Sequence, residues 1–179
     1  MSTSSKAAGQ SPSPRAWRFL LVFLLVQAVL FTLEMLQPVK QGVIDPFTNS
    51  LALVSGYLMG VFDSGIAVDG IYISSLRKAF TLRIEAGCNG VEPMIIFTAA
   101  VVAFQASVKA KLMGIVIGFF GIQIINILRI ISLFYIGEWS LKAYEWAHLY
   151  VCQALILLDA FVLWVIWVRQ LDRYEIQKA

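Results

Sequence analysis

Residues 112–136 read LMGIVIGFFGIQIINILRIISLFYI and contain a single charged side chain, Arg129. A hydrocarbon core about 30 Å thick is crossed by roughly 20 predominantly apolar residues of α-helix. This stretch is long enough and apolar enough to meet that requirement. We therefore predict a membrane-spanning helix here, and the class of the whole protein follows from it.

The composition agrees with a membrane protein. The chain is 59% hydrophobic and 14% charged, with a mean hydropathy of +0.78, which is too apolar for an ordinary soluble domain. A shorter fifth stretch, 47–62, opens with polar residues. The sequence predicts an all-α polytopic membrane protein, one integral membrane domain over 15–179, with about four spanning helices at 17–36, 91–108, 112–136 and 149–168.

The segment before the first apolar stretch is different in character. Residues 1–14 are rich in Ser, Pro and Ala and cannot bury enough apolar surface to fold, so we expect a disordered cytoplasmic tail. Arg15 and Arg18 then precede the apolar run, as in a signal peptide. The run is long, however, and 32–38 offers no small-residue cleavage site. We expect an uncleaved anchor.

Positively charged residues indicate which helix ends face the cytoplasm. Three groups flank the predicted spans: Lys6, Arg15 and Arg18; Lys109 and Lys111; and Arg169, Arg173 and Lys178. Placing all three groups inside puts 37–90 outside, so 47–62 would lie in the outer interface or enter and return. The alternative has five spans, and it is mildly favoured by the basic residues that four spans leave outside, Arg77, Lys78 and Arg83.

Residues 66–85 change to a β pattern. Short β-branched runs flank the turn pair Asp69-Gly70, and apolar residues then alternate with polar ones over 80–85. Alternation between turn residues predicts a small outer-face β-hairpin or meander. Because a hairpin alone is marginally stable, we expect it to pack on helix 47–62, and its last strand would lead to Cys88.

Cys88 stands where this polar segment becomes a membrane helix. Gly87 and Gly90 bracket it, and Pro93 suits the first turn of the helix that follows. Glycines let a backbone approach a ligand closely. The partial positive charge of a helix N-terminus lowers the pKa of a nearby thiol and so raises its nucleophilic thiolate fraction. Cys88 is a candidate nucleophile, and the alternative is a small buried side chain in a tight turn.

Two further polar side chains are predicted on the same side of the membrane. Arg129 lies seven residues from the outer end of 112–136, so about 10 Å deep, and Asn126 on the same helical face could hold it. An intramembrane arginine costs at least about 2.5–3.5 kcal/mol on insertion and is a functional candidate, the alternative being snorkelling to the headgroups. His148, at the outer start of the last helix, could be a general base or an ordinary interfacial residue.

A family resemblance rests on three features in this order: EAGCNGVE at 85–92, NILRI at 126–130, and His148 ahead of the final span. Together they resemble the exosortase/archaeosortase family, most closely exosortase H, over about 45–167. The resemblance implies a membrane-embedded cysteine transpeptidase. Its catalytic residues would be Cys88 as nucleophile, Arg129 as transition-state stabiliser and His148 as general acid/base, supported by Asn89, Gly90 and Asn126. Some members have arginine in the position of His148.

The resemblance also implies the substrates and the place of action. These would be exported proteins with a C-terminal sorting motif, a membrane helix and a basic tail, cut through a thioester that passes to an amine, a hydroxyl or water. The site would serve protein sorting in the cell envelope, at the periplasmic face of the bacterial inner membrane. The sequence has no zinc-ligand spacing, P-loop or dinucleotide fingerprint. We expect the lipid bilayer as a partner, and no metal, cofactor or nucleic acid.

The other class of enzyme that the residues leave open is a thiol-disulfide membrane oxidoreductase. It would pair Cys88 with Cys152, the second of two cysteines, although the chain has no Cys-x-x-Cys. Cys152 falls one turn after His148, and we expect it to be part of the core. A small transporter and a non-catalytic membrane assembly subunit are the remaining alternatives.

Three acidic residues need an interpretation. Asp159, near mid-membrane, is expected to bond to a facing polar residue such as Gln123, or to couple to an ion in a small transporter. Glu85 and Glu92 flank the cysteine and could orient Arg129 or His148, although solvated surface is the expectation for Glu85.

Overall fold

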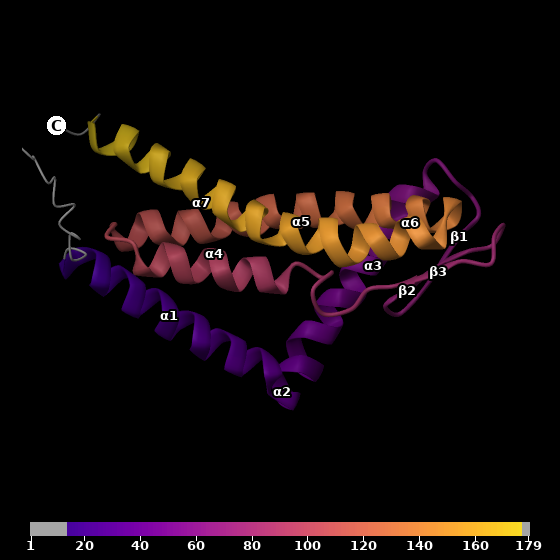
Figure 1. The fold of residues 1–179 in the computed structure, drawn as a ribbon, viewed down its shortest axis with the longest axis horizontal. Helices are drawn as coiled ribbons and strands as arrows, with labels where there is room; N and C mark the ends of the chain where they lie inside the picture. Colours follow the sequence, from indigo (N-terminus) through magenta and orange to yellow (C-terminus); the bar gives the residue numbers. More distant parts are fainter. Residues whose placement is uncertain (1–13, 177–179) are drawn as a thin grey trace, which may run out of the picture.

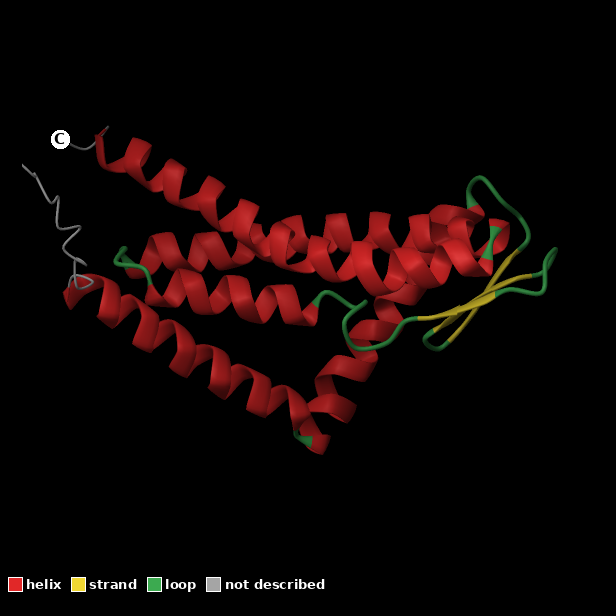
Figure 2. Ribbon diagram, viewed as in Figure 1, coloured by secondary structure: helices red, strands yellow, loops and turns green. Residues whose placement is uncertain are grey.

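The computed structural model describes residues 14–176, with side chains through residue 171. Most of this part of the chain is helical, with helices running side by side and one small sheet at one end of the molecule (Figure 1, Figure 2). The predicted disordered tail lies outside the described residues except for Pro14, at which the first helix begins.

Three helical stretches in the described part of the chain are long and apolar enough to cross a membrane. They are α1 (Pro14–Met35), α5 (Val108–Trp139) and the continuous stretch Leu141–Leu171. The last comprises α6 (Leu141–Trp146), the π-helical segment η2 (Ala147–Cys152) and most of α7 (Gln153–Ile176). Together with the apolar helix α4, they confirm the predicted all-α polytopic membrane class.

Helix α4, Val91–Ala103, is shorter than the predicted span 91–108. Its thirteen residues are about 20 Å long, against a hydrocarbon core of about 30 Å. The helix ends because Phe104 has an extended backbone, and Ser107 then caps α5 by accepting a hydrogen bond from the amide of Ala110 at 3.3 Å. Hydropathy continues across this break, so the sequence pattern did not reveal it. The crossing of the membrane by α4 stays a prediction.

The helix ends separate into two groups (Figure 1). The start of α1, the α4–α5 connection and the end of α7 lie at one end of the molecule, and the sheet lies at the other. Arg15, Lys109, Lys111 and Arg169 therefore share one end, as the predicted topology requires. The side of the membrane that each end faces stays a prediction.

Helices α1 and α3 form a V (Figure 1). The chain turns at α2 (Gln37–Val39) and the π-helical η1 (Lys40–Ile44), and α3 follows over Asp45–Gly60. At sixteen residues, about 24 Å, α3 is not among the candidate spans, which agrees with an interfacial helix better than with a fifth span. One face is buried: Thr48, Leu51, Ala52, Ser55, Gly56 and Met59.

The β segment forms three strands rather than a two-stranded hairpin. Strands β1 (Ile66–Asp69), β2 (Tyr72–Ser75) and β3 (Thr81–Arg83) form an antiparallel meander in that order. Gly70 in the first turn has φ +58°, a left-handed conformation that suits glycine. The sheet packs on α3, as expected, and also on α5 through Phe80, which lies over Gly137. The strand β3 then leads toward Cys88.

Candidate active site

Cys88 lies in the loop between β3 and α4. Gly87 and Gly90 on either side have φ of +88° and +76°, left-handed values that glycine adopts without strain. The amide of Cys88 donates to the carbonyl of Glu85 at 2.9 Å, closing a tight turn. The thiol is 7% exposed and belongs to the core formed by the sheet, α3 and α5. The sequence thus located both the turn and the helix start correctly.

His148 approaches the thiol from the other end of the chain. Its Nδ1 lies 3.4 Å from Sγ of Cys88, within hydrogen-bonding distance for sulfur. The imidazole stacks on the ring of Tyr144, with centroids 5.6 Å apart and planes 12° from parallel. His148 lies inside the π-helical segment η2, and not at the start of a helix as predicted. Single-turn π-helical segments frequently occur at functional sites.

Burial raises the pKa of the Cys88 thiol to about 12. Negative charge on Cys152, Glu92 and Glu85 adds to the increase, and the positive charge of Arg129 opposes it. The pKa of this thiol is raised and not lowered as predicted, because loss of solvent is the largest influence on it. Cys88 therefore rests as a thiol, and any reaction of its sulfur as a nucleophile would need a proton acceptor, which His148 could supply.

The two residues after Cys88 fix the start of α4. Asn89 is 2% exposed; its side chain accepts a hydrogen bond from the amide of Val91 at 3.1 Å and donates to Oγ1 of Thr48 at 3.2 Å. Thr48 in turn bonds back to the carbonyl of Ile44 instead of capping a helix. Asn89 thereby ties the Cys88 loop to α3, which supports the site structurally.

Gly90 permits the loop to pack closely on α5. A Cβ atom at this position would lie 2.9 Å from Nε2 of Gln123 and 3.2 Å from Nδ2 of Asn126. Both of those amide nitrogens are buried and without a hydrogen-bond partner in the described structure. Because Gly90 has no side chain, the unpartnered amides of Gln123 and Asn126 can lie close to the backbone that follows Cys88.

Arg129 is buried at 7% exposure and does not snorkel. Its Nη1 donates to Oδ1 of Asn126 at 3.4 Å, as predicted, and its Nη2 pairs with Asp159 on α7. The expected partner of Asp159, Gln123, is therefore wrong. Helix α5 ends at Trp139, three residues beyond the predicted boundary, so Arg129 lies ten residues, or about 15 Å, from its end.

Arg129 makes no hydrogen bond to Cys88 among the described contacts, but its charge lowers the pKa of the thiol. The two side chains therefore interact electrostatically across the site. The guanidinium Nε is buried and has no partner in the described structure. This leaves one donor available for a group that enters the site.

Cys152 is also buried, as expected of a core residue, and it lies one turn after His148. It is a free thiol, as is Cys88. A negative charge on Cys152 would raise the pKa of the Cys88 thiol, so the two sulfurs interact electrostatically. No disulfide bond joins them. The pairing that an oxidoreductase would need is absent from this structure, which includes both cysteines of the chain.

The two glutamates have different surroundings. Glu85 is exposed, as expected, and pairs with Arg83 at 3.0 Å. Glu92 accepts a hydrogen bond from the amide of Gly87 at 2.5 Å, so it holds the Cys88 turn and orients neither Arg129 nor His148 among the described hydrogen bonds.

Sequence reasoning missed three features of the site: the Arg129–Asp159 pair, the stacking of Tyr144 on His148, and the brace from Glu92 to the Cys88 turn. Only the first had a usable signal. Opposite charges inside a membrane usually pair with one another, and Asp159 and Arg129 are the acid and the base nearest the middle of their predicted spans.

The comparisons with known proteins give one result. A model of the transmembrane exosortase family (Exosortase_EpsH) matches residues 7–167, a range that contains every predicted site residue. No curated protein and no solved structure matches the sequence significantly. Because the family match extends over far more than half of the chain, this protein belongs to the transmembrane exosortase family.

Proposed function

We propose that this chain is a membrane-embedded cysteine transpeptidase or protease, most like exosortase H, that removes C-terminal sorting tails from exported proteins. The observation that carries the proposal is the 3.4 Å contact between Sγ of Cys88 and Nδ1 of His148. A nucleophile within hydrogen-bonding reach of a base is the arrangement on which covalent acyl transfer depends. The periplasmic face of the inner membrane is the proposed place of action.

The first step follows from the state of the thiol. Burial holds the pKa of Cys88 at about 12, so little thiolate exists before substrate binds. The sulfur therefore attacks the scissile carbonyl as its proton moves to Nδ1 of His148, in the manner of a hydroxyl nucleophile with an adjacent base. Stacking on Tyr144 keeps the imidazole in the orientation that this transfer needs.

The oxyanion that forms needs donors that are already in position. Arg129 is proposed for this role, together with the backbone N–H of Asn89 next to the nucleophile. The guanidinium of Arg129 is held by Asn126 and Asp159 and still has a buried, unpartnered Nε–H. A donor fixed by other contacts costs little reorganisation when charge develops.

In the remaining steps, the proton taken by His148 passes to the leaving amine. His148 returns the proton to the leaving amine as the peptide bond breaks, and the N-terminal part of the substrate stays on Cys88 as a thioester. An amine, a hydroxyl or water then attacks the thioester carbonyl, and the sulfur leaves and regains a proton. The cleaved tail stays in the membrane.

A groove beside the start of α4, which begins three residues after Cys88, could take apolar side chains from the helix of such a substrate. It has a volume of about 310 Å³ and lies among α1, η1, α3, α4 and α5, with Leu30, Phe47 and Val91 among its lining residues. Gln123 also lines it, and both polar atoms of this amide are buried and unpartnered in the described structure. Gln123 could therefore bond to a backbone group of the substrate near the start of its helix.

The direct test is tail removal in cells that produce this protein with an exported substrate bearing a sorting motif, a membrane helix and a basic tail. Cys88→Ser keeps the shape of the site but supplies a far weaker nucleophile, so processing should stop. Cys152→Ser is the matched control and should process nearly normally. Unchanged processing by Cys88→Ser, or its loss only in Cys152→Ser, would contradict the proposal.

A further inference from the structure

A second cavity lies at the opposite end of the molecule from the sheet, and nothing in the proposed reaction uses it. It has a volume of about 830 Å³ and is formed by residues of α1, the α4–α5 connection, α5 and α7. Pockets that hold small ligands generally have volumes of about 300–1,000 Å³. The size is therefore that of a ligand site.

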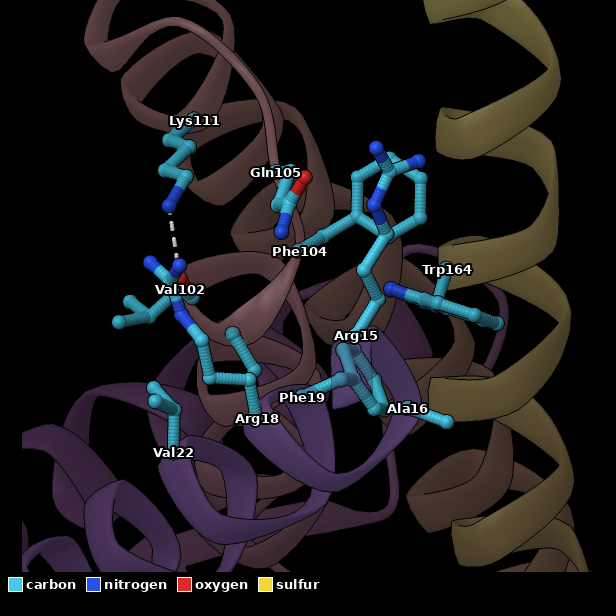
Figure 3. Close-up of a pocket in the computed structure, with 11 residues that line it drawn as sticks. Arg15, Ala16, Arg18, Phe19, Val22, Val102, Phe104, Gln105, Lys111 and Trp164 are labelled. Carbon is cyan, nitrogen blue, oxygen red and sulfur yellow. Dashed lines mark hydrogen bonds between the residues drawn. The ribbon is translucent and has the colours of Figure 1, made fainter. Parts of the chain in front are cut away.

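Three basic side chains line the cavity: Arg15, Arg18 and Lys111 (Figure 3). Both arginines rise from α1, and Lys111 faces them from α5 (Figure 3). Lys111 uses one of its three hydrogens on the carbonyl of Val102, at 2.7 Å. Within the side chains that the structure describes, none of the three cations has an ion-pair partner. The described lining of the cavity is therefore strongly cationic.

Three aromatic side chains, Phe19, Phe104 and Trp164, also line the cavity. The indole of Trp164 on α7 lies between Phe19 and Phe104, with ring centroids 6.1 Å and 6.0 Å apart. Its Nε1–H points toward the cavity (Figure 3), and this nitrogen is buried without a hydrogen-bond acceptor in the described structure. A buried donor that lacks a partner costs free energy, and an acceptor that entered the cavity would recover it.

The two kinds of wall match the two parts of an anionic phospholipid. Cations and an N–H donor suit a phosphodiester headgroup, and aromatic rings suit the first part of its acyl chains. Basic pockets between membrane helices are known to hold such headgroups. This end also carries Lys109 and Arg169, the basic residues that the positive-inside rule assigns to the cytoplasmic leaflet, where anionic lipids are neighbours of the cavity. The same charges would repel the basic end of a sorting tail.

We propose that this cavity, formed around Arg15, Arg18, Lys111 and Trp164, is a binding site for the headgroup of an anionic glycerophospholipid. The site is independent of the cysteine chemistry. A bound headgroup would link α1 to α5 and α7, because its negative charge would be shared by cations that have no anionic partner in the described structure.

The experiment measures lipid binding to the purified, delipidated full-length protein by native mass spectrometry. Phosphatidylglycerol is titrated against phosphatidylcholine, which has the same phosphodiester but no net charge. We expect wild-type protein to prefer phosphatidylglycerol by about tenfold or more, since each nearby basic side chain contributes on the order of fivefold. Equal binding of the two lipids would overturn the proposal.

Matched variants separate this site from general surface charge. Arg18→Gln/Lys111→Gln removes two cations from the cavity, and Lys109→Gln/Arg169→Gln removes two from the same end outside it. The first pair should weaken phosphatidylglycerol binding by about tenfold or more and the second by less than about threefold. Equal losses would show diffuse attraction and contradict the site.

Two further measurements keep the test decisive if the first pair folds poorly. Trp164→Phe keeps an aromatic ring but removes the N–H, and it should weaken binding by roughly threefold to tenfold. Inorganic phosphate at millimolar concentration should not displace the lipid, because it lacks the acyl chains that reach the aromatic wall. Full displacement by phosphate, or no effect of Trp164→Phe, would overturn the assignment to a lipid.

Discussion

At the scale of single residues, the site depends on burial more than on local helix charge. Cys88 has the glycine turn and the helix start that usually activate a thiol, yet loss of solvent raises its pKa to about 12. Arg129 likewise lies buried with Asp159 rather than reaching the headgroups. In the proposed reaction, both side chains act only when a substrate arrives.

The raised pKa of Cys88 predicts slow, strongly pH-dependent alkylation. At pH 8 a thiol with a pKa of about 12 is roughly 10⁻⁴ thiolate, so a Cys152→Ser protein should react with iodoacetamide roughly 10³-fold more slowly than an ordinary thiol. Because a raised pKa keeps the thiol protonated, the rate should rise about tenfold per pH unit up to pH 10.

The control for this measurement is a cysteine placed at an exposed site, Trp139→Cys, in a protein that lacks both natural cysteines. Trp139 is 81% exposed, so its replacement should reach a plateau near pH 9, as an ordinary thiol does. A plateau below pH 9 for Cys88 would show that the resting site already contains thiolate.

We predict that the proposed reaction needs the planar guanidinium of Arg129, with its fixed N–H donors, and not only its positive charge. Arg129→Lys keeps a cation beside Asp159, so thermal unfolding in detergent should change little. Lysine cannot reproduce the fixed donors of a guanidinium, so tail processing should fall about 10²–10³-fold, the usual cost of losing an oxyanion donor.

Arg129→Ala completes the comparison. It leaves Asp159 without its cation, and breaking a buried pair costs about 3–5 kcal/mol, so this variant should be less stable as well as inactive. If Arg129→Lys processes substrate at the wild-type rate, Arg129 has no part in the reaction.

At the scale of elements, the site is assembled from pieces that are separate in the sequence. Cys88 lies in the loop between β3 and α4, His148 lies in η2, and the Arg129–Asp159 pair joins α5 to α7. What orders them is packing between elements: Phe80, just before β3, lies over Gly137 of α5 and against the ring of Tyr144, at 5.6 Å between centroids.

Gly137→Ala is predicted to disturb this packing. An added Cβ would overlap the ring of Phe80, which is enclosed by Phe134 and Tyr144 and cannot simply turn away. Overpacking of this kind costs about 1–3 kcal/mol, and it should lower both thermal stability and processing because the loop that follows β3 carries Cys88.

Gly60→Ala is the matched control for that change. Nothing lies within 4 Å of a Cβ at Gly60, the last residue of α3, so alanine should be neutral or slightly stabilising there. A Gly137→Ala protein as stable and active as Gly60→Ala would show that the sheet does not depend on this contact.

The sequence allowed part of this arrangement to be predicted. Cys88 stood out because glycines bracket it at the start of a helix, and Arg129 because a charge inside a membrane is costly. His148 stood out as a candidate base at the outer start of the last helix, and the Asp69-Gly70 turn marked the sheet. Opposite charges were a usable signal for pairing Asp159 with Arg129, whereas hydropathy carried none, because the rotation of α7 relative to α5 depends on packing of all their neighbours. The π-helical segment around His148 also has no signal in residue type.

At the scale of the whole molecule, the two ends differ in chemistry. One end has the sheet, α6 and the nearby Cys88 loop; the other has the N-terminus of α1, the α4–α5 connection and a cationic cavity (Figure 1, Figure 3). A bundle with distinct ends can hold one membrane orientation, and the basic groups at one end predict which.

Single-cysteine labelling in intact cells tests this orientation. In a protein without Cys88 and Cys152, a membrane-impermeant thiol reagent should modify cysteines placed at Asp69 and at Trp139, and should not reach one placed at Lys109. Labelling at Lys109 with protection at Asp69 would reverse the topology and place the site on the cytoplasmic side.

The most direct measurement of the central claim is detection of the acyl-enzyme on Cys88. Purified protein is mixed with a sorting-tail substrate, quenched in acid and digested, and the peptide that contains Cys88 is analysed by mass spectrometry. The proposed chemistry predicts a hydroxylamine-sensitive adduct with the mass of the N-terminal substrate fragment, present in Cys152→Ser and absent in Cys88→Ser. Substrate cleavage by Cys88→Ser at the wild-type rate, or an adduct on Cys152 instead, would contradict it.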